Sequence, residues 1–264
     1  MTALIALAKE PPAKPNLKVI FGRIACILAP FVLWEVLPRI GVVPEKMLPR
    51  FSEVLVAGYE IFTEENIFKH IGTTVVEVGL SFVIVVPMSI LVGYMIGINP
   101  YVRSILEPIV NYFVGVPKSI FLPLLILALG LGITQKVVFG VLQAVFIVTA
   151  TMITGMRSVP DGLPEYTRLQ RATPWQKFVH MYMPAVMPVV LEGVRLGMIF
   201  SMTGVLLAEM YASQTGLGRL VAQYGRAFDL SKLLAVALLV AVISIFINTA
   251  LTALERRAGR WRAN

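Results

Sequence analysis

A series of long apolar stretches constrains this chain more than any other feature. Several windows hold more than about 18 predominantly apolar residues in succession, enough for a helix to cross a hydrocarbon core of about 30 Å. Apolar residues make up 57% of the 264 residues and charged residues only 14%, whereas soluble domains hold roughly a quarter charged residues. The sequence therefore predicts an all-α polytopic membrane protein with no room for a large soluble domain.

The apolar pattern predicts six transmembrane helices after an N-terminal segment of residues 1–17. The expected spans cover residues 19–37, 74–98, 104–131, 137–154, 185–208 and 233–254. Residues 104–135 are the difficult part, because one straight helix there would be roughly 48 Å long. Pro117 and Pro123 favour one kinked span, since each removes a helix hydrogen bond. Two short spans with a turn are the alternative.

The distribution of lysine and arginine predicts the orientation. Six spans place both termini and the segment 157–184 on the basic side of the membrane, and the positive-inside rule makes that side the cytoplasm. Basic residues expected inside are Lys9, Lys14, Lys18, Arg23, Arg103, Arg157, Arg168, Arg171, Lys177, Arg256, Arg257, Arg260 and Arg262. The N-terminus lacks the order of a cleavable signal peptide, so the first span is expected to remain as an anchor.

Charge and cysteine content exclude several classes of function. The net charge of +8 comes from loops and span ends, where basic residues set topology and contact lipid headgroups, so nucleic-acid binding is not expected. Cys26 is the only cysteine, which excludes a disulfide and a cysteine metal site. His70 and His180 are expected in separate loops and predict no metal site.

Residues 157–184 form a polar island between apolar spans. Thr173 and Gln176 have the spacing of a capping box, with Pro174 at the first helical position. One apolar helix face follows, formed by Trp175, Phe178, Val179 and Tyr182. Pro184 is expected to end this helix before the fifth span. A long, patterned segment of this kind indicates a docking element for a cytoplasmic partner, and an interfacial hairpin is the structural alternative.

The island resembles the cytoplasmic loop of the permease subunits of binding-protein-dependent (type I) ABC importers. That loop has the pattern EAA, three residues, Gly, and then about nine residues ending in I-x-LP. Glu165 and Pro184 match the pattern in register, whereas Arg171 replaces the glycine. Because arginine is expected to keep ordinary backbone angles, the bend is expected at Thr173-Pro174 instead.

Other stretches extend the resemblance over roughly residues 40–262. Residues 70–132 and 184–210, together with the glycine pair in QTGLGRLV at 214–221, look like the nitrate, sulfonate and taurine branch of this family. The resemblance implies the type I importer fold, with MetI-like topology, in a bacterial inner membrane. It also implies a homodimer, two ATP-binding subunits and a periplasmic solute-binding protein.

The resemblance assigns the coupling to the ATPase to the island. The expected coupling residues are Glu165, Tyr166, Arg168, Arg171, Ala172, Thr173, Pro174 and Trp175. No phosphate-binding loop of the form GxxxxGKS or GxxxxGKT occurs, so ATP and Mg²⁺ are expected on a separate ATPase chain and no cofactor on this one. The chain itself is therefore expected not to be an enzyme.

Polar residues inside the spans are candidates for the translocation path, because burying them in a membrane is costly. The candidates are Asn111, Tyr112, Lys118, Gln143 and Thr203. Lys118 could attract an anion, or it could pair with Glu107 or a backbone carbonyl. Glu192 and Arg195 are expected to form an ion pair near the inner gate. Glu77 is expected at the membrane interface, and Gly93, Gly97, Gly193 and Gly197 are expected to pack helices closely.

The function predicted from these features is a permease subunit for a small solute, with sulfonate, nitrate or a similar anion favoured. Pyrimidine-like and flavin-like solutes remain open. A secondary transporter is one alternative, but it would need an ion site and an inverted repeat, neither of which the sequence displays. An integral membrane enzyme is the other, and no set of catalytic groups converges at one depth.

Overall fold

The computed structural model of the protein describes residues 17–64, 66–160, 162, 171 and 173–258. Every regular element in this part of the chain is a helix, as the all-α fold class requires. The elements are α1 (Leu17–Arg39), α2 (Phe51–Glu64), α3 (Ile67–Ile98), α4 (Pro100–Gly115), η2 (Lys118–Phe121), α5 (Leu122–Leu129), α6 (Ile133–Arg157), α8 (Pro174–Lys177), η3 (Phe178–Tyr182), α9 (Met183–Ala212), α10 (Leu217–Arg226) and α11 (Leu230–Ala258).

Five helices in the described part of the chain are long and apolar enough to cross a membrane. They are α1, α3, α6, α11 and the uninterrupted helix from Pro174 to Ala212 that joins α8, η3 and α9. A sixth candidate is the pair formed by α4 and the segment Lys118–Leu129, which are bent by 82° relative to each other. The predicted number of six spans is reached when this bent pair counts as one.

The bend falls where the sequence provides a reason for it. Val116 and Pro117 both have extended backbone angles, because a proline disfavours the helical conformation of the residue before it. The kink expected at Pro117 is therefore present, and it is a full break of the helix. Pro123 causes no kink, since it lies in the first turn of α5, where a missing N–H is tolerated.

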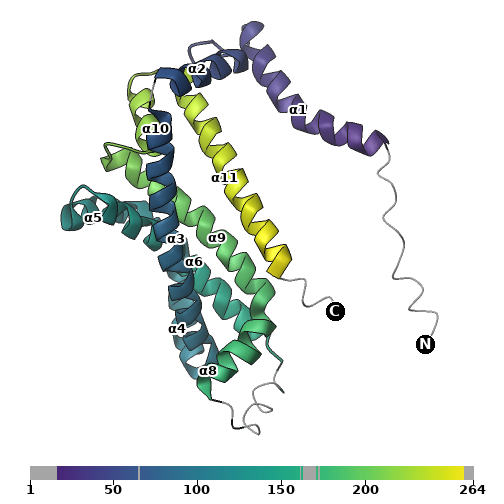
Figure 1. The fold of residues 1–264 in the computed structure, drawn as a ribbon, viewed down its shortest axis with the longest axis vertical. Coiled ribbons are helices and arrows are strands. Elements are labelled where there is room, and N and C mark those ends of the chain that lie inside the picture. Colours follow the sequence, from purple (N-terminus) through teal and green to yellow (C-terminus); the bar gives the residue numbers. More distant parts are fainter. Residues whose placement is uncertain (1–16, 65, 161, 163–170, 172, 259–264) are drawn as a thin grey trace.

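Three helices, α3, α6 and α9, form the packed centre of the bundle (Figure 1). Glycines allow them to approach closely: a Cβ atom on Gly93 would lie 2.6 Å from the Cβ of Met152, and one on Gly97 would lie 2.6 Å from the Cβ of Met156. A Cβ atom on Gly197 would lie 3.1 Å from Cγ2 of Val86, whereas one on Gly193 would lie 3.5 Å from Cγ2 of Thr151, an ordinary contact. The predicted close packing is confirmed for Gly93, Gly97 and Gly197, as expected for membrane helices that associate through small residues.

A second apolar cluster joins α2, α10 and α11 at the end of the bundle opposite α8 (Figure 1). Its members include Val54, Ile61, Leu217, Leu220 and Val236, which are almost fully buried. Neither α2 nor α10 was expected, because both lie in segments that the hydrophobic pattern assigns to polar loops. Below, this end is called the distal end, and the end with α8 is called the island end.

Helix α1 extends away from the rest of the bundle (Figure 1). It contacts α2 through Phe31 and Trp34, whose rings lie 5.2 and 5.4 Å from that of Phe51. Glu35 accepts a hydrogen bond of 2.9 Å from the backbone N–H of Ser52, which ties the end of α1 to the start of α2. Most other side chains of α1 are exposed in the single chain.

Candidate functional site

The island end contains the capping box that the sequence predicts. The Oγ1 atom of Thr173 accepts a hydrogen bond from the backbone N–H of Gln176 (3.3 Å), and Oε1 of Gln176 accepts one from the backbone N–H of Thr173 (2.8 Å). Pro174 occupies the first turn of α8, as expected. These local bonds fix where the island helix begins.

The backbone of Arg171 contradicts one expectation. Its φ of +52° lies in the left-handed region, so the arginine does not keep ordinary backbone angles. This conformation costs a residue with a side chain roughly 1–2 kcal/mol. The turn before α8 therefore includes Arg171 itself, in addition to the expected position at Thr173-Pro174. The other expected coupling residues, Glu165, Tyr166, Arg168 and Ala172, lie outside the described residues.

A π-helical turn at Phe178–Tyr182 connects the island helix to the spanning helix. The expectation that Pro184 ends the island helix is wrong, because α9 continues directly from this turn. The backbone N–H of Met183 bonds to the carbonyl of Phe178, five residues earlier. Proline has no N–H and its ring would clash in an α-helix. In the wider π turn the backbone hydrogen bonds join residues five apart. This altered pairing lies next to Pro184, and the helix continues past it.

Aromatic rings anchor this turn to α3. The ring of Tyr94 lies edge-on between Phe178, at a centroid distance of 4.7 Å, and Tyr182, at 5.4 Å. Tyr182 is buried in a cluster with Met152 and Met156 of α6. Phe178 and Tyr182 of the predicted apolar face therefore pack against α3 and connect α8 to α9, whereas Val179 is exposed.

Trp175, at the other end of the same face, stays outside this packing. Its side chain is 70% exposed, and its closest aromatic neighbour is Phe178, at a centroid distance of 5.6 Å. An exposed tryptophan on a helix start that is rigidly joined to a spanning helix offers a partner a large apolar contact. This geometry supports docking, and the continuous helix provides a path from the contact to the bundle core.

Four of the five expected path residues lie on three different helices. Asn111 and Tyr112 are exposed on α4, and Thr203 is exposed on α9, where its hydroxyl donates to the carbonyl of Ile199 (2.9 Å). Gln143 of α6 is half-buried beside Gly204. Three of the four thus face outward from the single chain, where a second protomer or lipid can reach them.

Lys118 contacts a backbone carbonyl, which was the structural alternative to attracting an anion. Its buried ammonium group donates to the carbonyl of Val114 (3.2 Å) and lies 6.0 Å from the ring centroid of Phe146. It does not pair with Glu107, whose carboxylate instead accepts a hydrogen bond of 2.6 Å from Arg157. This second contact ties α4 to the end of α6.

The expected ion pair between Glu192 and Arg195 is not among the ion pairs of the described residues. Arg195 reaches across to α11 instead, where its Nη2 lies 3.4 Å from the hydroxyl of Thr252. Two residues three apart on one helix can pair, but here the guanidinium group turns toward a neighbouring helix. Arg195 therefore connects α9 to α11.

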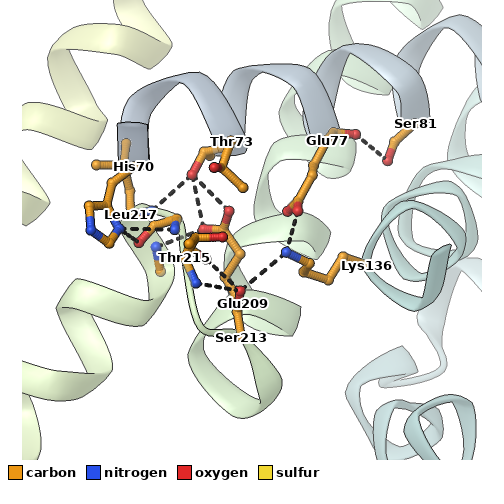
Figure 2. Close-up of polar contacts among 12 residues, drawn as sticks. His70, Thr73, Glu77, Ser81, Lys136, Glu209, Ser213, Thr215 and Leu217 are labelled. Carbon is orange, nitrogen blue, oxygen red and sulfur yellow. Dashed lines mark hydrogen bonds and ion pairs between the residues drawn. The ribbon is translucent and has the colours of Figure 1, made fainter. Parts of the chain in front are cut away.

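The distal end contains a buried ion pair that the sequence reasoning missed. The carboxylate of Glu77 on α3 pairs with the ammonium group of Lys136 on α6, and their side chains are only 2% and 6% exposed. Figure 2 shows the two side chains pointing toward each other. Glu77, expected at the membrane interface, lies about 15 Å along α3, and its carboxylate is buried against α6.

Glu209, near the end of α9, caps the start of α10 with its carboxylate. Its carboxylate accepts hydrogen bonds from the hydroxyl of Thr74 (2.8 Å) and from the backbone N–H of Gly218 (2.8 Å). The Thr74 hydroxyl in turn accepts from the backbone N–H of Leu217 (2.9 Å). The first N–H groups of a helix have no partner within the helix, so side chains from α3 and α9 cap α10 (Figure 2).

The glycine pair at 216 and 218 is required by this cap. Gly216 has φ of +109°, and a Cβ atom on either glycine would collide with Glu209. His70, expected in a loop, lies in α3, and its Nδ1 accepts a hydrogen bond of 3.0 Å from the backbone N–H of Gly216. Two features of the sequence could have indicated this site. Charged residues at 77, 136 and 209 lie in or beside apolar stretches, and the glycines at 216 and 218 are not part of a dinucleotide-binding motif.

Comparison with known proteins agrees with this architecture. The chain is 26% identical over 255 residues to the taurine transport system permease protein of Escherichia coli, covering 95% of this chain and 92% of the relative. It is 25% identical over 260 residues to a putative aliphatic sulfonates transport permease protein of Bacillus subtilis, covering 97% and 92%. A chain of the methionine ABC transporter MetNI, solved in inward facing conformations, matches with a TM-score of 0.59 at 21% identity, covering 72% of this chain and 93% of that one.

A family model supplies the assignment. The model of the binding-protein-dependent transport system inner membrane component matches residues 86–260, about two thirds of the chain. The match begins inside α3 and includes the bent pair, the island and the residues of the distal cap on α9 and α10. The relatives are transport permeases rather than enzymes. The chain belongs to the family of binding-protein-dependent transport system inner membrane components, and it is the multi-pass permease component of an ABC importer.

Proposed function

We propose that this permease works as a homodimer with two ATP-binding subunits, and that the island is the element through which ATP drives it. Family membership implies ATP-binding subunits and a solute-binding protein. In this proposal ATP and Mg²⁺ are bound on the ATPase chains, and this chain holds no cofactor. The observation that carries it is the unbroken helix from Pro174 to Ala212, with an exposed Trp175 at its start.

The continuous helix explains how a small motion at the island reaches the rest of the bundle. Tyr94, Phe178 and Tyr182 fix α8 against α3, so α8 cannot pivot freely. A push on Trp175 is therefore passed to α9 and, through the close helix contacts, to α3 and α6. Rigid-body motion of packed helices is a common basis of such switching. Glu165, Tyr166, Arg168, Arg171 and Ala172 complete the proposed coupling surface.

The charge distribution supports a cytoplasmic island. Lysine and arginine are concentrated in the island and toward both termini, and such segments stay inside. The distal end, with α2 and α10, then faces the binding protein. In this proposed orientation Trp175 lies on the side where ATP is available, and the distal cap lies on the side where solute arrives.

The solute is proposed to be a small organic sulfonate or a chemically similar small molecule. Two relatives are named for taurine and for aliphatic sulfonates, and both cover nearly the whole chain. Asn111, Tyr112 and Thr203 are exposed on the single protomer, so the facing of two copies would bring such side chains onto a shared path.

Replacement of Trp175 tests the coupling. Trp175→Ala in the complex with ATP-binding subunits and binding protein is expected to lower uptake of labelled taurine by about thirtyfold, the effect of losing an aromatic anchor worth about 2 kcal/mol. ATP hydrolysis is expected to continue without stimulation by the binding protein. The control is Tyr101→Ala, which removes a similarly exposed aromatic residue (74%) from the start of α4. Normal stimulated hydrolysis and uptake in Trp175→Ala would refute the coupling role.

A further inference from the structure

A cavity of about 690 Å³ lies beside the buried ion pair at the distal end. Several parts of the fold converge on it: α3, α5 and the segment after it, the start of α6, the end of α9 and the loop that follows. Its polar lining is formed by Glu77, Lys136, Tyr211, Ser213, Gln214 and Thr215, and an apolar wall includes Ile126, Leu131 and Ile133. A volume of this size is typical of sites for small organic ligands.

The charged groups of this cavity keep unused hydrogen-bonding capacity. The Lys136 ammonium group contacts Glu77 and donates to Ser213 Oγ (3.1 Å), whereas an ammonium group has three N–H donors. The Oε2 atom of Glu77 has no hydrogen-bond partner among the described residues, although Glu77 is 99% buried. Buried polar atoms are almost always paired, and this carboxylate oxygen keeps an unused acceptor position in a residue that lines the cavity.

The balance of charge selects the kind of ligand. Glu77 and Lys136 are the charged side chains of the described residues that line the cavity, and together they are neutral. A ligand with a net negative charge is attracted by Lys136 but meets the carboxylate of Glu77 beside it. A ligand with a net positive charge meets Lys136. A dipolar ligand satisfies both partners, because its ammonium group can face Glu77 and its acidic group can face Lys136 and the hydroxyl of Thr215.

We propose that this cavity is a binding site for a small zwitterion, one that carries an ammonium group and an acidic group a few bonds apart. The assignment rests on the proposed import of a small solute and specifies its class. It replaces the simple anion that the sequence favoured, because Lys118 is engaged by a backbone carbonyl and Lys136 by a carboxylate. Glu77 determines the preference for the ammonium group, and Lys136 binds the acidic group.

Two probes that differ in one group test the proposal on the purified full-length permease. Taurine carries an ammonium and a sulfonate group, and isethionate has a hydroxyl in place of the ammonium. Binding of labelled taurine, and its displacement by isethionate, are measured by scintillation proximity. We expect the wild-type chain to prefer taurine by about tenfold, since charge-assisted hydrogen bonds are roughly twice as strong as neutral ones. Glu77→Gln is expected to abolish the preference while leaving isethionate affinity within about threefold.

Folding controls keep this test decisive. Glu77→Gln retains the size and shape of the side chain, and the exchange Glu77→Lys with Lys136→Glu retains a neutral buried pair if either single change prevents folding. Equal or tighter binding of isethionate by the wild-type chain would overturn the proposal. So would an unchanged taurine preference in Glu77→Gln, or no saturable taurine binding up to about 10 mM, which corresponds to a very weak site.

This outcome is separable from that of the proposed function. Co-purification with ATP-binding subunits and stimulation of their hydrolysis by the binding protein report on the importer and do not depend on the cavity. If these hold while taurine fails to bind, the importer stands and the zwitterion site falls. If taurine binds but no ATP-binding subunit associates, the coupling proposal falls.

Discussion

The two ends of the helix from Pro174 to Ala212 differ in chemistry. At the island end, a capping box and an exposed Trp175 face outward, and aromatic rings hold the helix from one side. At the distal end, Glu209 is 1% exposed and its carboxylate caps another helix, next to the buried pair of Glu77 and Lys136. A single helix thus connects a surface suited to a partner with a buried polar site. Substitutions at its two ends should therefore have different consequences.

The largest effect is expected from removing one partner of the buried ion pair. Lys136→Met leaves the Glu77 carboxylate buried without a counter-ion, which should lower the free energy of unfolding by about 3–5 kcal/mol. Unfolding of the purified chain, followed by tryptophan fluorescence in denaturant, measures this. The double variant Glu77→Gln with Lys136→Met should recover most of the loss, because no unpaired charge remains. A single variant as stable as wild type would show that the pair is not buried as described.

A smaller loss is expected from Gly216→Ala in the distal cap. The added Cβ combines an unfavourable backbone angle with a clash against Glu209, and we expect a loss of about 2–3 kcal/mol. Gly72→Ala is the matched control, since a Cβ there meets no atom within 4 Å and the residue lies within α3. This control should be neutral or slightly stabilising. Equal stability of both variants would argue against the cap.

At the island end, loss of the capping box should have a local effect. Thr173→Ala is expected to cost about 1 kcal/mol, confined to the first turn of α8. Hydrogen exchange of the peptide that contains Trp175–Lys177 should become faster by about fivefold, while the distal end keeps its protection. Thr173→Ser retains the hydroxyl and should behave as wild type. Faster exchange throughout α9 would instead show that the island and the spanning helix unfold together.

The smallest effect is expected at Arg171. Arg171→Gly relieves the cost of a left-handed arginine but adds flexibility to the unfolded chain, so the stability should change by less than about 1 kcal/mol. Arg171→Ala keeps the unfavourable backbone and removes the guanidinium group. Stimulated ATP hydrolysis separates the two contributions: a defect in both variants indicates that the guanidinium group contacts the ATPase, and a defect in Arg171→Ala alone indicates that the backbone turn matters.

The sequence was sufficient for features that depend on neighbouring residues. The capping box at Thr173, the break at Pro117 and the long apolar helices follow from local hydrogen bonding, from the missing N–H of proline and from hydrophobicity. The packing of Gly93 and Gly97 follows from their spacing on one helix face. The family and the fold class were likewise predictable, because the motifs that carry them are contiguous.

Features that depend on distant residues could not be predicted in this way. Glu77 and Lys136 are 59 positions apart and meet only because α3 and α6 pack side by side. Glu209 caps α10 together with Thr74, 135 residues away. The left-handed Arg171 and the π turn before Pro184 were missed for another reason: general rules disfavour both, and the surrounding structure overrides those rules.

The most direct test of the connection between the two ends is a distance measured in the assembled transporter. Tyr211→Cys in a Cys26→Ser background places a spin label at an exposed position (70%) near the distal end of α9. We expect ATP binding to change the distance between the labels of the two protomers, and we expect Trp175→Ala to abolish that change while the complex stays assembled. An equal ATP-dependent change with and without Trp175 would contradict the proposed transmission along this helix.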